Sequence, residues 1–382
     1  MALKIAYLLP NLESGGTERH VLSLARRLDG SRHSLSLFTT AGGGALYGEF
    51  SALMPVTVAG DPERGKRFRS SPREHLRTVR DLARIFRKER PDILHAYLPA
   101  ANVLGPAAAR LAGVRRVIVS KRAMADYKAD FPLLRRVEPL GNLLADVVLV
   151  NSDAVRRDIE RTERFCSGKF RKICNGVDPI APWTREQVED FRRREGIPPG
   201  APVILSVSNF YPYKGLDDLV AAAPRVVASF PAAVFLLAGR DAGTMERCRA
   251  LAAQGGVAEN VRFLGDRTDV ADCIRASDLF VHPSHEEGFS NAILEAMAGS
   301  RAVVACDVGG NPEAVRDGET GLLVPPRQPS ALADALVRLL ADPVRREAMG
   351  EAGHRRAAKH FSTERMVTEM ERLYDALMAE KR

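Results

Sequence analysis

Short apolar runs alternate with longer amphipathic segments along most of the 382-residue chain. The apolar runs have the length of buried strands. The segments between them, such as Thr17–Leu28 and Ala100–Leu111, repeat their apolar residues at the helical period of about 3.6. Strands that alternate with helices predict a parallel sheet with helices on both faces. The predicted strands of the first half are Lys4–Leu9, His33–Thr39, Val56–Ala59, Asp92–Ala96, Arg116–Ser120 and Val147–Val150.

The same alternation resumes after a proline-rich segment. An N-G-V-D run at 175–178 is followed by five prolines that flank one charged helix, which is typical of a linker. Because the chain exceeds one ordinary core, we predict two α/β domains, 1–180 and 181–362, followed by a C-terminal helix, 363–382. The prolines are Pro179, Pro182, Pro198, Pro199 and Pro202, and the predicted strands beyond them are Val203–Val207, Val234–Ala238, Val261–Leu264, Asp278–His282 and Ala302–Ala305.

The composition is that of a soluble globular protein. Hydrophobic residues make up 45% of the chain and charged residues 27%. No apolar stretch approaches the ~20 residues of a transmembrane helix. The first residues run directly into the first predicted strand, without the small-residue cleavage site of a signal peptide. We therefore expect a cytoplasmic protein.

Cysteines and acidic residues do not predict a metal centre. The cysteines are scattered without a C-x-x-C pair, so neither a disulfide framework nor a zinc site is indicated. The acidic residues show no metal-ligand spacing. We expect reduced, buried thiols at Cys166, Cys174, Cys248, Cys273 and Cys306.

Positive charge is concentrated in the first half of the chain. Up to Ile180 there are 31 Lys and Arg against 19 Asp and Glu, whereas the remainder has 25 against 29. An asymmetry of this size favours an anionic partner, which could be a membrane, an acidic glycan or nucleic acid. Nucleic acid is not expected, because the basic half carries no aromatic-interleaved basic motif and no recognition-helix signature.

The segment Arg73–Arg90 carries much of this charge on one face of a predicted helix. A basic amphipathic helix can lie against anionic lipid, although a solvated surface helix has the same pattern. Further along, Lys121–Arg136 places Phe131, Leu133 and Leu134 between basic residues on a predicted loop, where they would either contact an amphiphilic acceptor or pack internally. Peripheral attachment to the inner face of the plasma membrane is therefore a second hypothesis for the location. The arginines at helical spacing are Arg73, Arg77, Arg80, Arg84 and Arg87.

The stretch from Asp278 to Gly299 is the most informative for chemistry. It predicts a buried strand, then a polar loop, then a helix that begins near Ser290 and Asn291, either of which can cap it. The free N–H groups at that helix N-terminus favour a phosphate or sugar hydroxyls. Ligands of open α/β sheets lie at the carboxyl ends of the strands, where such loops gather.

Two carboxylates flank this predicted helix start. Glu287 lies in the loop and Glu295 lies eight residues on, inside the helix. Carboxylates at this spacing can accept hydrogen bonds from the sugar and ribose hydroxyls of one ligand, and Gly288 allows that ligand to approach the backbone closely. The plain alternative is that Glu295 is a solvated helix residue and Glu287 an ordinary loop acid.

Glu287, Gly288, Phe289 and Glu295 resemble the two-glutamate signature of retaining glycosyltransferases of family 4, also described as glycosyl transferases group 1. The resemblance extends over essentially the whole chain. It implies the GT-B fold, in which two Rossmann-like, doubly wound parallel-sheet domains face each other across a cleft. It also implies that residues 1–180 bind the acceptor, that residues 181–362 bind the nucleotide sugar, and that the helix 363–382 crosses back onto the N-terminal domain.

Two features of the first domain belong to this resemblance. Gly15 and Gly16 lie between the first predicted strand and helix, and the G-G-T-E run ending at Glu18 is similar to the N-terminal glycine loop of the family. Its amides suit a diphosphate, although dinucleotide and P-loop fingerprints are absent. The family often has a histidine at the position of Tyr97, reaching toward the donor sugar. That role could pass to Tyr97, stay with His95 or be absent, in which case His95 is a packed loop histidine.

The second domain has a lysine that matches the family's phosphate-binding lysine. Lys214 lies at a predicted helix N-terminus, where it can neutralise a diphosphate. The family commonly has an arginine five residues earlier, where this chain has Asn209, and Arg240 is a candidate substitute. In the family the base packs near the turn after Val261–Leu264, so the backbone of Arg267 is a candidate base contact.

Residues and resemblance together predict a retaining hexosyltransferase that uses a UDP- or GDP-sugar. Its acceptor would be a glycan or a lipid-linked sugar in cell-surface polysaccharide or glycolipid synthesis. Lys214 and the glycine amides would stabilise the diphosphate, while Glu295 and Glu287 would hold the ribose and sugar hydroxyls. No cofactor is expected, and the reaction should be metal-independent. The alternatives are a nucleotide-sugar epimerase of the same fold and a non-catalytic sugar-nucleotide-binding protein.

Overall fold

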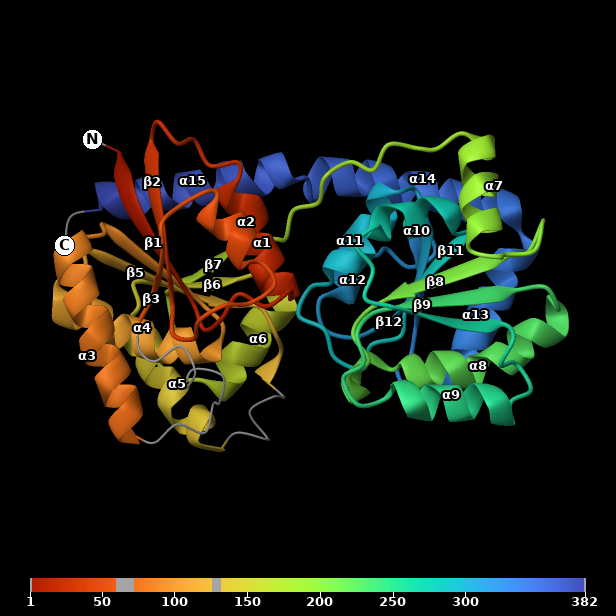
Figure 1. Cartoon of the computed structure of the whole chain (residues 1–382), viewed down its shortest axis with the longest axis horizontal. Coiled ribbons are helices and arrows are strands. Elements are labelled where there is room, and N and C mark those ends of the chain that lie inside the picture. The colour runs from red at the N-terminus through yellow and green to blue at the C-terminus, as the bar shows by residue number, and fades with distance from the viewer. Residues whose placement is uncertain (1, 60–71, 126–131, 381–382) are drawn as a thin grey trace. The chain divides into compact units, whose positions relative to one another are not determined.

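The computed structural model describes residues 2–59, 72–125 and 132–380 (Figure 1). Two compact units share the chain. Unit 1 contains Met1–Gly176 together with Thr363–Arg382, and unit 2 contains Val177–Ser362. The first division falls just before the predicted boundary at residue 180, and the C-terminal segment from Thr363 belongs to unit 1.

Unit 1 is built on a seven-stranded sheet in the order β3-β2-β1-β4-β5-β6-β7, in which every pairing is parallel. The strands are β1 (Leu3–Leu9), β2 (His33–Thr39), β3 (Val56–Val58), β4 (Ile93–Tyr97), β5 (Arg116–Lys121), β6 (Val147–Val150) and β7 (Phe170–Lys172). The helices are α1 (Gly16–Ala25), α2 (Tyr47–Ser51), α3 (Pro72–Glu89), α4 (Pro99–Ala112), α5 (Pro132–Leu144), α6 (Asp153–Thr162) and α15 (Thr363–Ala379).

Alternate side chains of β1 pack on opposite faces of this sheet. Ile5, Tyr7 and Leu9 belong to a core with residues of α1 and α15, whereas Ala6 and Leu8 belong to a core with residues of α3 and α4. A sheet buried on both faces produces the continuous apolar strands seen in the sequence.

Unit 2 repeats the plan with a six-stranded sheet in the order β10-β9-β8-β11-β12-β13, again parallel. The strands are β8 (Val203–Val207), β9 (Val234–Ala238), β10 (Val261–Gly265), β11 (Leu279–His282), β12 (Ala302–Cys306) and β13 (Gly321–Val324). The helices are α7 (Arg185–Arg194), the 3-10 turn η2 (Pro212–Lys214), α8 (Leu216–Ser229), α9 (Met245–Gln254), α10 (Val270–Ala276), α11 (Asn291–Ala298), α12 (Asn311–Ala314), α13 (Pro329–Ala341) and α14 (Pro343–His360).

Both sheets have a point at which the strand order reverses. In unit 1 it lies between β1 and β4, and in unit 2 between β8 and β11. The loops that leave the carboxyl ends of these strands diverge to opposite faces of the sheet, which opens a crevice where ligands of doubly wound folds bind. The two sheets confirm the predicted α/β class.

Some elements differ from those that the sequence predicts. Strand β7 was missed because its three residues, Phe170–Lys172, are mostly charged and lie at the sheet edge. The predicted loop Lys121–Arg136 gives way to α5 at Pro132. Phe131 lies outside the described residues, and the side chains of Leu133 and Leu134 are likewise not described.

Helix α15 completes the core of unit 1. Met370 is fully buried and packs in the same core as Tyr7 and Leu9 of β1. We predict that Met370→Ala lowers the free energy of unfolding by about 2–5 kcal/mol, because it leaves a cavity in a packed core. Urea unfolding followed by circular dichroism measures this change.

The neighbouring Glu369→Ala is the control. Glu369 is partly exposed, and its one ion pair within the described ranges is with Arg365 one turn away, so its loss should cost less than about 0.5 kcal/mol. Equal stability of Met370→Ala and the wild type would show that α15 is not part of this core.

Candidate active site

The loops at the β8/β11 reversal bring Lys214 and Glu287 together. Lys214 ends η2 and precedes α8, while Glu287 lies in the loop between β11 and α11. Lys214 Nζ donates to Glu287 Oε2 over 2.7 Å. Both side chains are mostly buried, with 17% and 14% of their surface exposed. The predicted phosphate-binding lysine and the predicted sugar-binding acid therefore share one site.

Glu287 has a second partner that the sequence did not reveal. Nε2 of His282, at the end of β11, lies 2.8 Å from the same Oε2, and Ser284 Oγ lies 3.1 Å from that nitrogen. Burial lowers the pKa of His282, although Glu287 opposes this effect, so the neutral ring donates its Nε2–H to the carboxylate. A histidine in an apolar strand run gives no sequence signal of this contact.

Burial and charge act in opposite directions on the ionised pair. Burial raises the pKa of Glu287, but the Lys214 ammonium and the His282 hydrogen bond outweigh it and hold that pKa well below its usual value. Burial lowers the pKa of Lys214, and Glu287 more than offsets this effect. Both groups are therefore charged at neutral pH.

Two glycines allow the surrounding loops to approach closely. Gly309, after β12, has φ +52°, and a Cβ on it would overlap the carbonyl oxygen of Glu287. Gly215, after Lys214, has φ +63°, and a Cβ there would overlap the carbonyl oxygen of Pro283. The N–H of Gly310 donates to Glu287 O over 3.2 Å. These contacts fix the backbone that carries the Lys214–Glu287 pair.

Helix α11 begins next to this loop, as predicted. Ser290 is the N-cap, and its hydroxyl accepts from Ile293 N over 3.3 Å. Asn291 and Glu295 are partly exposed and, being four residues apart, share one face of α11. Gly288 and Phe289 are buried instead.

The Phe289 side chain does not face a ligand. It is 3% exposed and packs edge-on against Phe361, with ring centroids 5.4 Å apart. The donor contact of Phe289 stays a prediction, and with the ring buried it would be made by the backbone. The ring supports the loop from inside unit 2.

Asn209, Arg240 and Arg267 follow three neighbouring strands, but only one of them offers a surface cation. Asn209 Oδ1 accepts from the backbone N–H of Arg240 over 3.0 Å, so Asn209 shapes the loop after β9. The Arg240 side chain is 42% exposed and lies 3.9 Å from Asp266. Among the three, Arg240 is the residue placed to supply further positive charge.

The Arg267 guanidinium is bound by two carboxylates. It donates to Asp269 over 2.7 Å and to Glu195 over 3.0 Å. The hydrogen bond to Asp269 and the one to Glu195 raise the pKa of Arg267 despite burial. Any contact of Arg267 with a base would come from its backbone, as expected.

In unit 1, Gly15 is the N-cap of α1 and has no side-chain cap. The Glu18 carboxylate folds back to this turn, since a Cβ on Gly15 would overlap Glu18 Oε2. A carboxylate there repels a diphosphate, so an anion could bind at Gly15 and Gly16 only if Glu18 moved. The G-G-T-E run was predicted to bind a phosphate, but its acidic residue, Glu18, occupies the N-terminus of α1.

His95 and Tyr97 lie inside unit 1, so the predicted contact of either side chain with a substrate stays a prediction that would need these residues to become accessible. Both side chains are fully buried, and their rings stack at a centroid distance of 4.3 Å. His95 Nδ1 lies 2.9 Å from Tyr374 Oη, and His95 Nε2 lies 2.8 Å from Ser120 Oγ. These residues form a polar network inside unit 1, which is the packed arrangement considered as an alternative for His95.

One group of possible metal ligands lies near Gly215. Oxygen and nitrogen atoms of Asp217, Asp218 and His285 lie within 4.8 Å of one another among the described residues. Each acid already has a partner, because Asp218 contacts His285 at 2.7 Å and Asp217 contacts Arg247 at 3.2 Å. The cluster is explained by these pairs, and metal independence stays a prediction.

Two family descriptions match most of the chain. Glycosyltransferase Family 4 matches residues 14–180, and Glycosyl transferases group 1 matches residues 201–342. The first match lies within unit 1 except at its end, and the second lies within unit 2.

Two curated relatives are about one third identical to this chain over the residues that align. A D-inositol 3-phosphate glycosyltransferase of Corynebacterium urealyticum is 34% identical over 243 residues, which span 61% of this chain and 57% of the relative. A GDP-mannose-dependent monoacylated alpha-(1-6)-phosphatidylinositol monomannoside mannosyltransferase of Corynebacterium glutamicum is 31% identical over 319 residues, or 80% and 81% of the two chains.

A solved structure has the same fold. The crystal structure of Anabaena HepE in complex with UDP and glucose superposes with a TM-score of 0.84 at 22% identity, over 98% of this chain and 100% of the other. Two doubly wound parallel sheets of this kind, with this match, define a GT-B protein. The chain belongs to the family 4 glycosyltransferases, as the sequence resemblance predicted.

The position of Glu287 should depend on Gly309. We predict that Gly309→Ala weakens UDP or GDP binding, because the new Cβ must displace the Glu287 backbone and the +52° φ adds strain of about 1–3 kcal/mol. Isothermal titration calorimetry with each nucleotide measures the change.

Gly318→Ala is the matched control. Gly318 has φ +75°, but no atom lies within 4 Å of its Cβ position. It should lose comparable stability without losing nucleotide affinity. Equal affinities of the two variants would mean that the Gly309 loop does not position the site.

Proposed function

We propose that this chain transfers a hexose from a nucleotide-diphosphate sugar to an acceptor, with retention of the anomeric configuration. The observation that carries the proposal is the contact between Lys214 and Glu287 at the β8/β11 reversal, beside the start of α11. An ammonium there supplies charge for a pyrophosphate, and a carboxylate accepts hydrogen bonds from sugar hydroxyls.

A donor would enter a site in which these charges already neutralise each other. The Lys214 ammonium has three N–H donors, so it can bind phosphate oxygens while keeping one bond to Glu287. Glu287 retains the His282 hydrogen bond, which holds its carboxylate in place. Glu295, on the exposed side of α11, is the residue we assign to the ribose hydroxyls, following the family resemblance.

The reaction separates charge. As the bond between the anomeric carbon and the diphosphate breaks, negative charge grows on the leaving group, and Lys214 and the amides at the α11 N-terminus stabilise it. The acceptor hydroxyl attacks from the same face, and its proton passes to the departing phosphate oxygen. Glu287 fixes the sugar so that the anomeric carbon faces the acceptor.

The names of relatives guide the choice of substrates. One relative is GDP-mannose-dependent and HepE was crystallised with UDP, so both UDP- and GDP-sugars are donor candidates. The relatives' acceptors are D-inositol 3-phosphate and a phosphatidylinositol monomannoside. We propose a glycan or lipid-linked acceptor in the synthesis of a cell-surface polysaccharide or glycolipid.

A panel of UDP- and GDP-sugars, scored for nucleotide release, tests the transferase proposal. Lys214→Ala and Glu295→Ala should each lower kcat/KM by about 10²–10³-fold, the usual cost of removing one stabilising group at a charged leaving group or a positioning contact. Product NMR should show the anomeric configuration of the donor. Interconversion of sugars without nucleotide release would instead identify an epimerase, and binding without turnover a non-catalytic protein.

Lys359→Ala and Glu347→Ala are the matched controls, because both side chains are exposed on α14 of unit 2. They should retain full turnover. Circular dichroism must show that all four variants are folded. Full activity of both Lys214→Ala and Glu295→Ala would refute the site.

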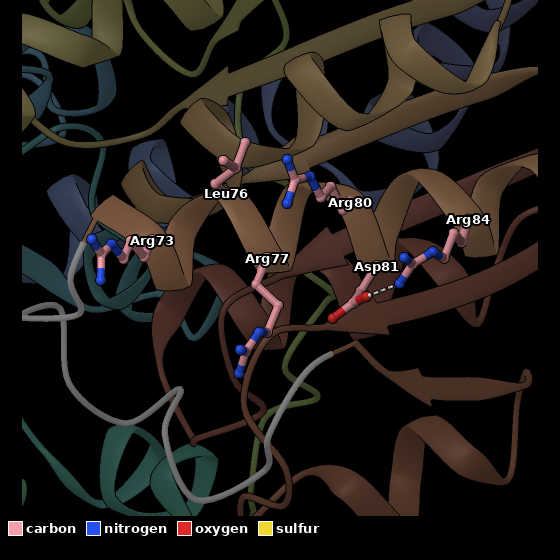
Figure 2. Close-up of a pocket in the computed structure, with 6 residues that line it drawn as sticks. All are labelled: Arg73, Leu76, Arg77, Arg80, Asp81 and Arg84. Carbon is pink, nitrogen blue, oxygen red and sulfur yellow. Dashed lines mark hydrogen bonds and ion pairs between the residues drawn. The ribbon is translucent and has the colours of Figure 1, made fainter.

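We also propose that α3 brings the chain to an anionic membrane. Figure 2 shows Arg73, Arg77, Arg80 and Arg84 extending from one side of α3, with Leu76 among them. Arg84 pairs with Asp81 at 2.8 Å, whereas the other three arginines have no acidic partner in the described part of the chain. Leu76 is 50% exposed. Among the described residues, no helix is both long and apolar enough to cross a bilayer.

The charge on α3 is enough for measurable attachment. Each arginine near an anionic surface contributes about 1 kcal/mol, so the three unpaired ones contribute about 3 kcal/mol, or roughly a hundredfold in partitioning. We predict that vesicles containing anionic lipid sediment the wild type and that Arg73→Gln/Arg77→Gln/Arg80→Gln largely abolishes this. Vesicles of phosphatidylcholine alone should recover neither protein.

The control removes the same charge elsewhere. Arg185, Arg193 and Arg225 are exposed in unit 2, and each already pairs with an acid. Their triple glutamine variant should sediment like the wild type. If both triple variants lost vesicle binding equally, net charge alone would explain the binding, and α3 would be rejected as the membrane-binding surface.

A further inference from the structure

Arg122 lies at the carboxyl end of β5, near the β1/β4 reversal of unit 1. Three distant parts of the chain meet at its side chain. Arg122 Nη1 donates to His20 Nε2 of α1 over 3.1 Å, and Nη2 donates to Asn175 Oδ1 over 2.6 Å. The Asn151 amide donates to Arg122 O over 3.3 Å, which fixes the backbone. The guanidinium is held in one place, and its residue is partly exposed.

Within the described residues, the Arg122 charge has no acidic counterpart. Its side-chain partners are an amide and an imidazole, and no carboxylate of the described residues pairs with it. Burial, followed by the charge of Arg122, lowers the pKa of His20, so that ring is neutral. Burial also lowers the pKa of Arg122 to about 10, which still leaves the guanidinium charged at neutral pH.

Lys121, the residue before Arg122, is a buried cation that does have acidic partners. Lys121 is buried and contacts the carboxylates of both Glu138 and Glu163, the latter at 3.0 Å. A buried cation without such a partner is costly, because the charge leaves water without an anion in exchange. Acids of unit 1 neutralise Lys121, whereas no acid in the described ranges neutralises Arg122.

Toward the residues that the structure describes, the Arg122 guanidinium also keeps unused donors. It carries five N–H groups, and the two neutral acceptors take one each. A planar guanidinium with free N–H groups matches the oxygens of a phosphate or carboxylate, and an anion of this kind would supply the missing charge.

We propose that Arg122, oriented by His20 and Asn175, binds an anionic oxygen group, phosphate or carboxylate, of the acceptor. The inference rests on the proposed function, since the acceptor is assigned to unit 1 because the chain belongs to a glycosyltransferase family. It narrows the acceptor to an acidic one and gives the anionic group a defined partner. Lys214, in the other unit, serves the diphosphate of the donor.

Binding without any donor tests this site directly. Isothermal titration calorimetry would compare inorganic phosphate, myo-inositol 1-phosphate, glucuronate and uncharged myo-inositol. Wild-type protein should bind at least one anionic probe, and Arg122→Gln should weaken it about 10- to 100-fold, the range for a hydrogen bond to a charged group. Arg122→Lys keeps the charge but loses the paired N–H groups of the guanidinium. Its affinity for the anionic probe should lie between those of the wild type and Arg122→Gln. Binding of the phosphate probes would identify the anionic group as a phosphate, and binding of glucuronate would identify it as a carboxylate.

Arg171→Gln is the control, because Arg171 is exposed in the same unit and, among the described residues, donates to a backbone carbonyl alone. It should bind every probe like the wild type. Anion affinity that is equal in Arg122→Gln and wild type, or anionic probes that bind no better than myo-inositol, would overturn the inference. Circular dichroism and the graded Arg122→Lys result exclude misfolding as the cause of a loss.

Nucleotide affinity separates this inference from the proposed function. UDP or GDP binding should be the same in Arg122→Gln and in wild type. Anion binding that depends on Arg122 in a protein without transferase turnover would overturn the proposed function and keep the anion site. If the protein turns over a nucleotide sugar but its anion affinity does not depend on Arg122, the anion site alone would be overturned.

Discussion

The close approach of Lys214 and Glu287 is the interaction on which the candidate site depends. It requires β8 and β11, which are far apart in the sequence, to be neighbours in the sheet, because only then do their loops leave the same edge. Burial makes an unpaired charge there costly, so each group holds the other in its ionised form. His282 adds a neutral donor below the carboxylate, and Gly215 and Gly309 let the backbone of three loops meet around it.

Much of this arrangement could be predicted from the sequence. Continuous apolar strands separated by amphipathic helices indicated two parallel sheets, and the strand–loop–helix around Glu287 indicated a ligand-binding loop with a Ser290 cap. The contact between Lys214 and Glu287 could not be predicted from the residues alone, because strand order is a property of the whole sheet. The contact of His282 with Glu287 was not predicted for a related reason, since the sequence shows His282 only as the last residue of a buried strand.

In unit 1, a residue at the carboxyl end of a strand is not always accessible to a ligand. His95 and Tyr97 do lie at the carboxyl end of β4, but both are buried. Tyr374, from α15, and Ser120 take up the two ring nitrogens of His95, and the Tyr97 hydroxyl lies 3.4 Å from His95 Nδ1. Glu18 likewise lies where the glycine turn suggested a phosphate. The lack of an acidic partner for Arg122 among the described residues had no sequence signal, because it becomes visible only once its neighbours in the fold are known.

The Tyr374 network has a consequence for how the protein is made. Tyr374 Oη lies 3.2 Å from Tyr7 Oη and 2.9 Å from His95 Nδ1, so the first and last elements of the chain share one buried polar cluster. A ribosome that adds about 5–20 residues per second finishes unit 2 before it releases α15. Until then the core on this face of β1, which α1 also lines, lacks the side chains of α15. Most of unit 1 is synthesised before unit 2, but its core can be completed only once α15 has been made, and nascent chains should need protection from aggregation up to that point.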